Sequence, residues 1–237
     1  MLLETSVEVV NRLIAGLPRK ERKQILDHCE AVDLVFGEVL CDSDKPVAYV
    51  YFPISAFISQ LTTITGHPPL EMGLIGNEGV LGATLILGVN TTPLRAMVQG
   101  AGTALRIGSM EFRRDLGECP ALLRTMNRYL YVTMAQLSQT AACNHFHEIE
   151  PRLARWLLMT HDRAHADHFH LTHEFLADML GVRRSGITVA AGALQAKNLI
   201  GYTRGEISIL NRSGLEAAAC ECYEAVNNDY LQQFPVA

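Results

Sequence analysis

The most informative part of the sequence lies at residues 171–194 and reads LTHEFLADMLGVRRSGITVAAGAL. Thr172 stands directly before an apolar helical pattern, where its hydroxyl can cap the first turn of a helix. Gly181 follows that pattern and can end the helix in a left-handed conformation. The sequence therefore predicts a short helix, a tight turn, and a second helix that begins at about Arg184. The buried face of this second helix is predicted to consist of Ile187, Ala190, Ala191 and Leu194.

The spacing of small and branched residues in this segment is that of a helix-turn-helix. Ala177 lets two helices cross closely, Gly181 makes the turn four residues later, and Ile187 fills the core six residues after that. Two strand-like runs follow, at residues 199–202 and 205–210. A pair of short strands after the second helix predicts a β-wing, so we expect a winged helix.

The overall charge does not by itself indicate a nucleic-acid partner. The chain has 20 Lys and Arg residues against 25 Asp and Glu residues, which gives a formal net charge of −5. A DNA contact therefore needs a local basic patch. The basic residues on the second helix, at its end and around the wing are Arg183, Arg184, Lys197, Arg204 and Arg212. The alternative is that the helices and hairpin only pack together and that these side chains form a solvated surface.

We expect the start of the second helix to contact DNA. Arg184 can make a bidentate contact to a guanine in the major groove. Arg183 and Ser185 can bind phosphates at the same helix end. The residues expected to contact DNA are Thr172, Arg183, Arg184, Ser185, Thr188, Val189, Lys197 and Arg204.

The first half of the chain has a different pattern of apolar and turn-forming residues. Apolar residues at helical spacing predict helices within about the first 30 residues, and they include Val9, Val10, Leu13, Ile14 and Leu17. Short strand-like runs then occur between residues 32 and 75 and again between 94 and 107, separated by Gly and Pro. Short strands with such turn signals predict a small antiparallel barrel or sandwich.

A long helix is predicted from Pro120 to about Asn144, a segment without internal Gly or Pro. Its apolar residues recur at heptad spacing, which is typical of either one half of a coiled-coil dimer or a buried core helix. Because a long isolated helix needs a partner to bury its apolar face, we expect a homodimer. The expected interface residues are Leu123, Met126, Leu130, Met134, Leu137 and Ala141.

This order of elements resembles the CRP/FNR family of bacterial transcription regulators. The segments that carry the resemblance are residues 171–194, Asn198 to Tyr202 with the wing, Glu78 to Gly82, and Cys143 to Ala154. The resemblance implies an α+β fold in three parts. They are an effector-sensing antiparallel β-roll (a jelly-roll of the cyclic-nucleotide-binding type) with N-terminal helices at 1–119, a dimerisation helix at 120–146, and a winged helix-turn-helix DNA-binding domain at 147–237.

The resemblance also implies a homodimer that binds a palindromic double-stranded DNA site, changes conformation with a signal, and contacts RNA polymerase if it is an activator. In the family's best-known members, two arginines and a glutamate of the recognition helix face the bases. Here only Arg184 matches, because Ser185 stands in place of the glutamate and Val189 in place of the second arginine. The usual half-site is therefore not expected, and Val189 is a candidate for contact with a thymine methyl group.

The effector is less well defined by the sequence. The residues that stand where this family binds its effector are Glu78, Gly79, Arg95 and Ala96. A cyclic nucleotide is not favoured, because Glu78 and Arg95 are 17 residues apart and Ala96 replaces the small hydroxyl residue of cyclic-AMP binders. Arg95 can bind an anion, or it can pair with a surface carboxylate. An unknown small-molecule effector remains open.

Protein-bound iron is not expected. The chain lacks the N-terminal cysteine cluster of the family's iron–sulfur sensors, because only Cys29 precedes Cys41. The candidate axial ligands for a haem are His28, His67 and Cys41, but a lone histidine is more often structural.

No other metal site is predicted. The six cysteines contain no CxxC pair and are expected to be reduced thiols. Cys220 and Cys222 have the wrong spacing for a zinc knuckle, and Cys143 is a candidate redox thiol only. His161 and His165 lie one helical turn apart, but the histidine-rich segment 161–173 is expected to be an exposed polar linker.

The sequence does not favour a membrane protein or an enzyme. No apolar run reaches the ~18 residues of a membrane span, and the first residues lack a signal-peptide pattern, so a cytoplasmic protein is expected. Ser109, Ser185 and Cys119 have no base supplied by a motif, and Gly100-Ala-Gly102 is a weak nucleotide signal. We therefore expect a signal-responsive DNA-binding regulator. The alternative is a constitutively active regulator whose β-roll is only a dimer scaffold.

Overall fold

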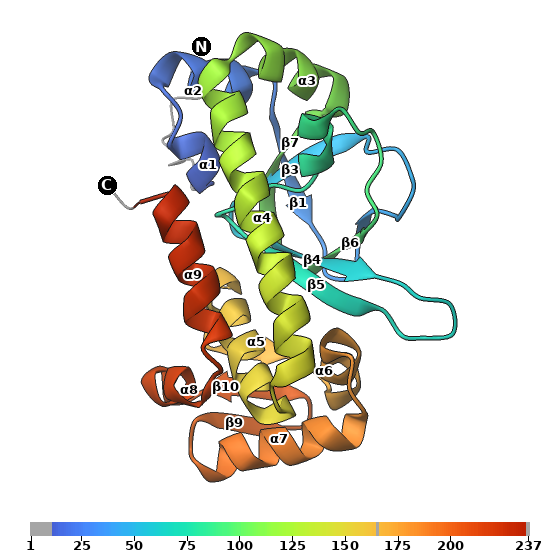
Figure 1. The fold of residues 1–237 in the computed structure, drawn as a ribbon, viewed down its shortest axis with the longest axis vertical. Helices are drawn as coiled ribbons and strands as arrows, with labels where there is room; N and C mark the ends of the chain where they lie inside the picture. The colour runs from blue at the N-terminus through green and yellow to red at the C-terminus, as the bar shows by residue number, and fades with distance from the viewer. Residues whose placement is uncertain (1–10, 165, 236–237) are drawn as a thin grey trace. The chain divides into compact units, whose positions relative to one another are not determined.

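The computed structural model describes residues 11–164 and 166–235 of the chain (Figure 1). The residues are grouped in two compact units. Unit 1 consists of Met1–Ile58 and Ile75–Leu130, and unit 2 consists of Ser59–Leu74 and Tyr131–Ala237. No helix within the described residues is both long and apolar enough to cross a bilayer.

The chain enters unit 1 through two short helices, α1 (Arg12–Ala15) and α2 (Arg19–Asp27). Asn11 fixes α1 from both sides. Its Oδ1 accepts hydrogen bonds from the backbone amides of Leu13 and Ile14, and its Nδ2 donates to the carbonyl oxygens of Pro53 and Gly79 at 3.1 and 3.0 Å. Leu13, Ile14 and Leu17 are buried, as their spacing predicts. Val9 and Val10 lie outside the described residues.

The predicted antiparallel β-roll is present as two sheets. The first sheet has the order β1-β7-β3 and the second has the order β2-β6-β4-β5. The strands are β1 (Glu30–Leu34), β2 (Val39–Cys41), β3 (Tyr49–Pro53), β4 (Phe57–Thr62), β5 (Leu70–Ile75), β6 (Arg95–Gly100) and β7 (Gly102–Gly108), with a 3₁₀ helix η1 (Ala83–Leu87) before β6. Strand β2 was not predicted, because it is only three residues long and its register with β6 is irregular.

The core of unit 1 draws side chains from both sheets. Its members include Leu34 of β1, Tyr51 of β3, Ile58 of β4, Val98 of β6 and Ala104 of β7. Burying an aliphatic side chain of this size contributes about 1.5–3 kcal/mol. The burial of these side chains between the two sheets therefore holds the sheets together.

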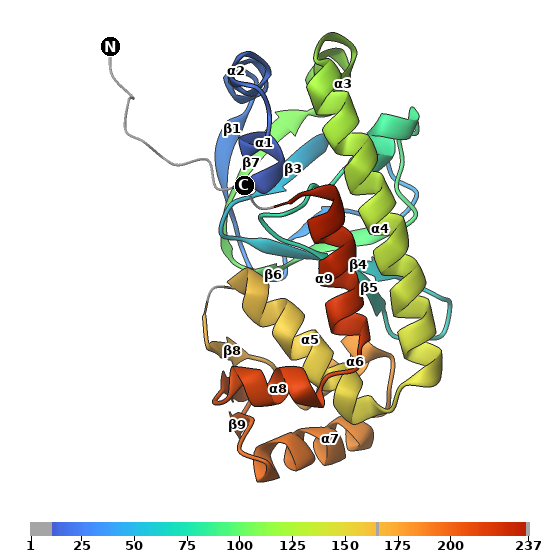
Figure 2. The same cartoon turned by 60° about the vertical axis from the view of Figure 1, so that its left-hand side comes forward.

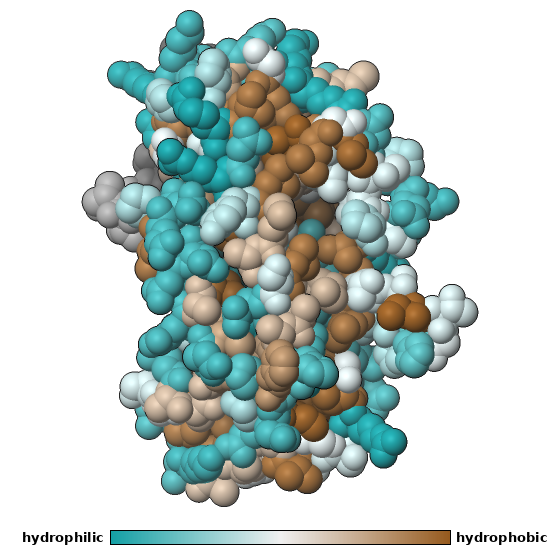
Figure 3. All heavy atoms as spheres, in the orientation of Figure 1, coloured by the Kyte–Doolittle hydropathy of each residue, from teal (hydrophilic) through white to brown (hydrophobic). Residues whose placement is uncertain are grey.

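The long helix is present as α4, which runs without interruption from Pro120 to Phe146 and follows the shorter α3 (Ser109–Glu118). Part of its predicted dimer stripe is accessible: Leu123 is 38% exposed and Met134 is 67% exposed. Ala141 is also exposed, and Leu130 and Leu137 are half-buried. Figure 3 shows apolar side chains along the face of the molecule where α4 runs.

One predicted interface residue is wrong. Met126 has no exposed surface within the single chain, so it has nothing to offer to a partner. Its side chain lies in the core of the same chain. Apolar residues recur at similar spacing on the buried and on the exposed side of α4, so the spacing alone does not show which side a residue faces.

The C-terminal half of unit 2 is a winged helix. Its elements are α5 (Ile149–Ala164), β8 (His168–His170), α6 (His173–Leu180), α7 (Arg184–Ala196), β9 (Ile200–Thr203), β10 (Glu206–Ile209), α8 (Arg212–Ala218) and α9 (Cys222–Gln233). The two predicted helices, the turn and the wing are confirmed. The hydroxyl of Thr172 caps α6 through the amide of Phe175, and Gly181 ends α6 at φ +64°. The predicted buried face of α7 is buried.

The histidine-rich segment is not a linker. His168, Phe169 and His170 form β8, which pairs antiparallel with β10, so the wing sheet has three strands in the order β8-β10-β9. In Figure 2, β8, β9 and α8 all lie on the left-hand side of the view. The buried Phe169 between two exposed histidines is a period-two pattern, but it is too short to be distinguished from a loop in the sequence.

We expect the turn at Gly181 to be sensitive to any side chain. Gly181→Val should lower the free energy of unfolding by about 2 kcal/mol, because a branched residue is strained at positive φ and its Cβ would come within 2.8 Å of Leu70 Cδ1. The control is Gly192→Ala in α7, where a Cβ meets nothing within 4 Å and stability should rise by up to ~1 kcal/mol. Urea unfolding followed by circular dichroism measures both. Equal effects would contradict this account of the turn.

Candidate nucleic-acid interface

The outer face of α7 carries several of the predicted DNA-contacting side chains together. Arg184, Ser185, Thr188 and Val189 are all exposed, and they lie opposite the buried face of the helix. Val189 is 73% exposed. Arg184 has only a long contact of 3.8 Å from its Nε to Glu174 Oε2, with both side chains largely exposed. This face therefore combines a guanidinium, two hydroxyls and one exposed apolar residue, which are groups that suit base edges and a thymine methyl.

The N-terminal end of α7 suits an anion. Arg183 is the N-cap residue, and its side chain makes no capping hydrogen bond. A helix start without a side-chain cap leaves backbone N–H groups available to a phosphate oxygen. The exposed side chains of Arg183 and Arg184 add positive charge at the same end. Thr172 uses its hydroxyl oxygen as the acceptor that caps α6, which leaves its proton available to a phosphate.

Two other predicted contacts have different surroundings. Arg204 lies in the turn between β9 and β10 at φ +51°, followed by Gly205 at φ +88°, and it is exposed at the tip of the wing. Lys197 follows α7, and its ammonium group lies 2.5 Å from Glu150 Oε1. A partly exposed ion pair of this kind is weak, so Lys197 can exchange Glu150 for a phosphate.

Arg212 does not belong to the basic patch. It opens α8, and its guanidinium contacts Asp162, Glu216 and the hydroxyl of Tyr223 at 2.7, 2.9 and 2.8 Å. It also contacts Nδ1 of His161, whose Nε2 lies 2.7 Å from Asp167. Both ring nitrogens of His161 are thus engaged within the domain. His165, its predicted neighbour at metal-ligand spacing, lies outside the described residues.

His173 joins three elements of the interface, a role that sequence reasoning missed. Its ring, on α6, stacks on Tyr202 of β9 with centroids 4.3 Å apart. Its Nδ1 lies 3.0 Å from the hydroxyl oxygen of Thr188 on α7. Because that hydroxyl can donate to the carbonyl of Arg184, His173 Nδ1 is the donor. Burial and the charge of Arg184 lower the pKa of His173, which favours the neutral ring.

The β4–β5 hairpin contributes a buried acid to unit 2. Glu71 is buried and accepts hydrogen bonds from Ser59 Oγ at 2.7 Å and from Trp156 Nε1 of α5 at 2.8 Å. Its burial raises the pKa of Glu71 to about 7, although these two hydrogen bonds and the charges of Arg155 and Arg163 act in the opposite direction. Sequence alone could not indicate this contact, because its partners are 85 residues apart.

The residues expected to bind an effector are mostly explained by packing. Ala96 is 1% exposed in the core of unit 1, so its methyl group packs within the protein. A Cβ at Gly79 would lie 2.5 Å from the hydroxyl of Tyr129, which explains the glycine without a ligand. Arg95 Nε lies 3.2 Å from Asp42 Oδ1, the surface pairing that was the alternative to anion binding. Glu78 Oε1 accepts from the amide of Gly76.

Two of the three haem candidates, His28 and Cys41, have side-chain contacts within the protein. His28 Nδ1 lies 2.8 Å from Asp115 Oδ2, and the thiol of Cys41 lies 3.6 Å from the carbonyl of Asp42. Burial raises the pKa of Cys41, which disfavours the thiolate that would bind iron. These contacts give no support to haem ligation.

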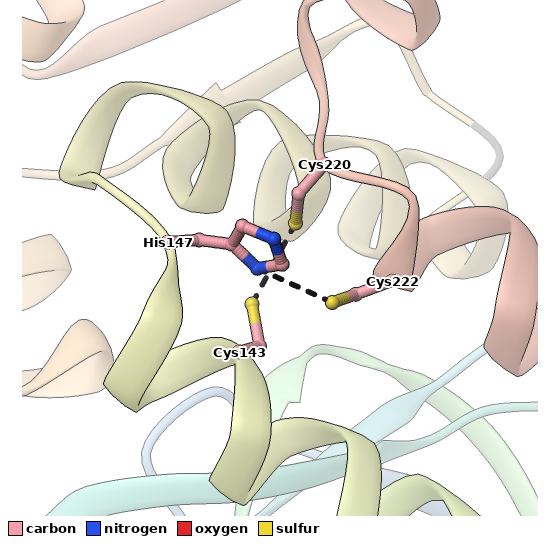
Figure 4. A group of neighbouring side chains, drawn as sticks. All are labelled: Cys143, His147, Cys220 and Cys222. Atoms are coloured by element: carbon pink, nitrogen blue, oxygen red, sulfur yellow. Dashed lines mark hydrogen bonds between the residues drawn. The ribbon is translucent and has the colours of Figure 1, made fainter.

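Three cysteines that the sequence did not predict to bind a metal come together in unit 2 with a histidine that the sequence analysis did not single out. Cys143, His147, Cys220 and Cys222 bring their ligand atoms within 4.8 Å of one another (Figure 4). The available signal was the four-residue interval from Cys143 to His147, one helical turn apart. The other two cysteines lie more than 70 residues away in the sequence, which only the fold can bring near.

Comparisons with known proteins agree with this geometry. Residues 151–218 match the family model of the Crp-like helix-turn-helix domain. A search of curated protein sequences gave no significant match.

Solved structures share the fold over most of their length. A protein described as a CRP/FNR-family transcriptional regulator from Eubacterium rectale is 15% identical, with a TM-score of 0.70, and the match covers 89% of this chain and 99% of that one. The c-di-GMP-responsive global regulator CLP of Xanthomonas campestris is 15% identical, with a TM-score of 0.67 and coverage of 81% and 99%. A CRP/FNR-family regulator from Thermus thermophilus is 19% identical, with a TM-score of 0.66 and coverage of 80% and 98%.

At these identities the likeness shows the fold, and it confirms the expected sequence of β-roll, long helix and winged helix-turn-helix. Both CRP/FNR-family structures are described as transcriptional regulators.

Glu71 should make stability depend on pH. The folded chain keeps the proton of Glu71 up to about pH 7, whereas the unfolded chain releases it near the ordinary value of 4.5. The free energy of unfolding should therefore fall as the pH rises through this range, by up to about 3 kcal/mol. Glu71→Gln should remove that part of the profile. Urea unfolding at pH 5, 6, 7 and 8 measures it, with exposed Glu224→Gln as the control. Parallel profiles for the wild type and Glu71→Gln would refute the assignment.

Proposed function

We propose that this chain is a transcription regulator of the CRP/FNR type, because residues 151–218 match the Crp-like helix-turn-helix domain, and that it acts in the cytoplasm as a homodimer on a palindromic DNA site. In this proposal residues 120–146 dimerise and residues 147–237 bind DNA. Residues 1–119 form a domain that senses a signal. The observation that carries the proposal is the exposed face of α7, with Arg184, Ser185, Thr188 and Val189 beside an uncapped helix start.

The proposed reading of DNA divides the side chains into two groups. Arg184 and Val189 contact base edges in the major groove, the first a guanine and the second a thymine methyl. Thr172, Arg183, Ser185 and Lys197 bind phosphates, as does Arg204 from the wing, while Thr188 supports the helix through His173. Phosphate contacts from few residues suit a chain whose net charge is −5, because the attraction is local and not spread over the molecule.

The proposed dimer uses the exposed stripe of α4. Its residues are Leu123, Leu130, Met134, Leu137 and Ala141, with Met126 removed from the set because it is buried in its own chain. Exposed apolar side chains at heptad spacing on one helix face match a second copy of the same helix. A two-fold dimer presents two α7 helices to half-sites about one helical turn, roughly 34 Å, apart.

The β-roll is the proposed site of signal sensing. A relative of the same fold, the Xanthomonas regulator, is described as responsive to c-di-GMP, which is consistent with a ligand-responsive β-roll. A second candidate, a constitutively active regulator whose β-roll is only a scaffold, is favoured by a specific observation. Ala96 is buried, a side chain at Gly79 would meet Tyr129, and Arg95 lies beside Asp42, so each of these residues has a contact within the protein.

The function is tested by selecting DNA from a random duplex library with the full chain without added effector, at ~0.15 M salt so that non-specific phosphate binding is suppressed. Enrichment of a two-fold palindrome supports the constitutive form of the proposal. Enrichment only in the presence of a nucleotide or under changed redox conditions supports the signal-responsive form. Absence of any enriched sequence under all these conditions would overturn sequence-specific binding.

The roles on α7 predict distinct effects of two substitutions. Arg184→Ala should weaken binding to the selected duplex by about ten-fold or more, because a bidentate base contact is worth about 1–3 kcal/mol. Val189→Arg should change the preferred base at one half-site position. Lys20→Ala, an exposed cation on α2, should change neither property. Fluorescence anisotropy and a repeated selection measure these effects, and an unaltered half-site for Val189→Arg would contradict its proposed base contact.

The α4 stripe predicts the state of association. Met134→Glu should shift the chain from dimer to monomer in sedimentation velocity, because it places a charge in the proposed interface, and it should leave folding intact because Met134 is 67% exposed in the single chain. Met110→Glu on α3 is a matched control, since Met110 is 77% exposed and lies outside the stripe. A Met134→Glu chain that remains dimeric would place the interface elsewhere.

A further inference from the structure

Three cysteines and one histidine converge where the winged helix meets the end of α4. Cys143 lies in the last turn of α4 and His147 directly after the helix. Cys220 lies between α8 and α9, and Cys222 opens α9. The three cysteines form a buried cluster of their own, with exposed fractions of 1%, 7% and 0%. Figure 4 shows the four side chains pointing toward one another from these separate segments.

The spacing of the ligand atoms fits a tetrahedral metal ion. The sulfurs of Cys143 and Cys220 are 3.6 Å apart, and the sulfur of Cys222 is 3.4 Å from Nδ1 of His147. With Zn–S bonds of ~2.3 Å and a Zn–N bond of ~2.0 Å, the edges of a tetrahedron are ~3.8 Å for two sulfurs and ~3.5 Å for sulfur and nitrogen. A disulfide would need its sulfurs at ~2.05 Å, and all six cysteines are free thiols.

Neighbouring polar side chains hold the ligand atoms in place, as they do around known metal sites. His147 directs Nδ1 at the sulfurs, and its Nε2 lies 3.2 Å from Glu221 Oε1. A carboxylate on the second ring nitrogen fixes the tautomer and orientation of a metal-binding histidine. Gln139 Nε2 donates to the sulfur of Cys222 at 3.0 Å.

Positive charge from α5 also favours the thiolate form. The guanidinium of Arg155 on α5 acts electrostatically on the sulfur of Cys143. A thiolate, and not a thiol, is the form that binds a metal. The charge of Arg155 partly balances the negative charge that three thiolates would carry around a divalent ion.

We propose that Cys143, His147, Cys220 and Cys222 form a closed site for one divalent transition metal ion, zinc in the cell. Three sulfurs and one imidazole are a ligand set that zinc prefers. All four positions are filled by the protein, so the site is structural and leaves no open position for a substrate.

The positions of the four ligands in the sequence determine which segments the ion joins. One pair precedes the helix-turn-helix at residues 151–218 and the other pair follows it. The ion therefore closes the base of the winged helix and ties the end of α4 to the start of α9. Because such a site does not exist in the unfolded chain, the free energy of metal binding adds to the stability of the folded unit.

The first test measures metal in the full chain, purified under reducing conditions with zinc in the medium. Mass spectrometry of the elements should find one zinc per chain. Replacement by Co²⁺ should give the intense visible absorption of tetrahedral cobalt and a thiolate-to-cobalt charge-transfer band in the near ultraviolet. Cys143→Ser should lose the zinc and the charge-transfer intensity, whereas Cys119→Ser, an equally buried cysteine of unit 1, should keep both.

A second variant covers the case in which Cys143→Ser does not fold. Glu221 is largely exposed, so Glu221→Gln should fold and bind zinc about 10–100-fold more weakly in competition with a colorimetric chelator, because it loosens the hold on His147. A folded wild-type chain that contains no zinc and gives no cobalt–thiolate band would overturn the proposal. A Cys143–Cys220 disulfide in protein purified under reducing conditions would also overturn it. So would a zinc affinity that is unchanged in both Cys143→Ser and Glu221→Gln.

Discussion

The buried guanidinium of Arg152 is the contact on which the arrangement of unit 2 depends. Its Nη2 donates to Asn144 Oδ1 at 2.8 Å and to the carbonyl of Leu180 at 2.6 Å. Asn144 lies near the end of α4, and Leu180 is the last residue of α6, directly before the Gly181 turn. One cation on α5 thus satisfies an orphan carbonyl at the end of α6 and binds the end of α4. Arg152 therefore joins the last residue before the Gly181 turn to both α5 and the end of α4.

Local chemistry explains how much of this could be predicted from the sequence. The helix-turn-helix and the wing depend on residues close in the chain, namely the cap at Thr172, the left-handed Gly181 and the buried Ile187, so their pattern is readable. Contacts between residues far apart in the chain cannot be predicted from such local patterns. Trp156 bonds Glu71 across 85 residues, and Met126 turns inward on a helix whose heptads look alike on both sides.

The cluster of Cys143, His147, Cys220 and Cys222 is a second set of contacts that the sequence does not predict. Each of its cysteines has an unremarkable position in the sequence, and only the packing of α8 and α9 against the end of α4 brings the sulfurs together. The interface on α7 differs, because its exposed residues all lie between positions 184 and 189 of one helix and can be assigned before the fold is known. An acidic chain can therefore carry a DNA-binding face, provided that its few cations are concentrated at the start of one helix and at the wing tip.

The central claim is that two copies of α7 read two half-sites on one DNA duplex. Hydroxyl-radical footprinting of the full chain on its selected duplex tests this most directly, together with the mass of the complex. The account predicts two chains per duplex and two protected segments related by a two-fold axis, with centres about one helical turn apart. A single protected segment bound by one chain would contradict it.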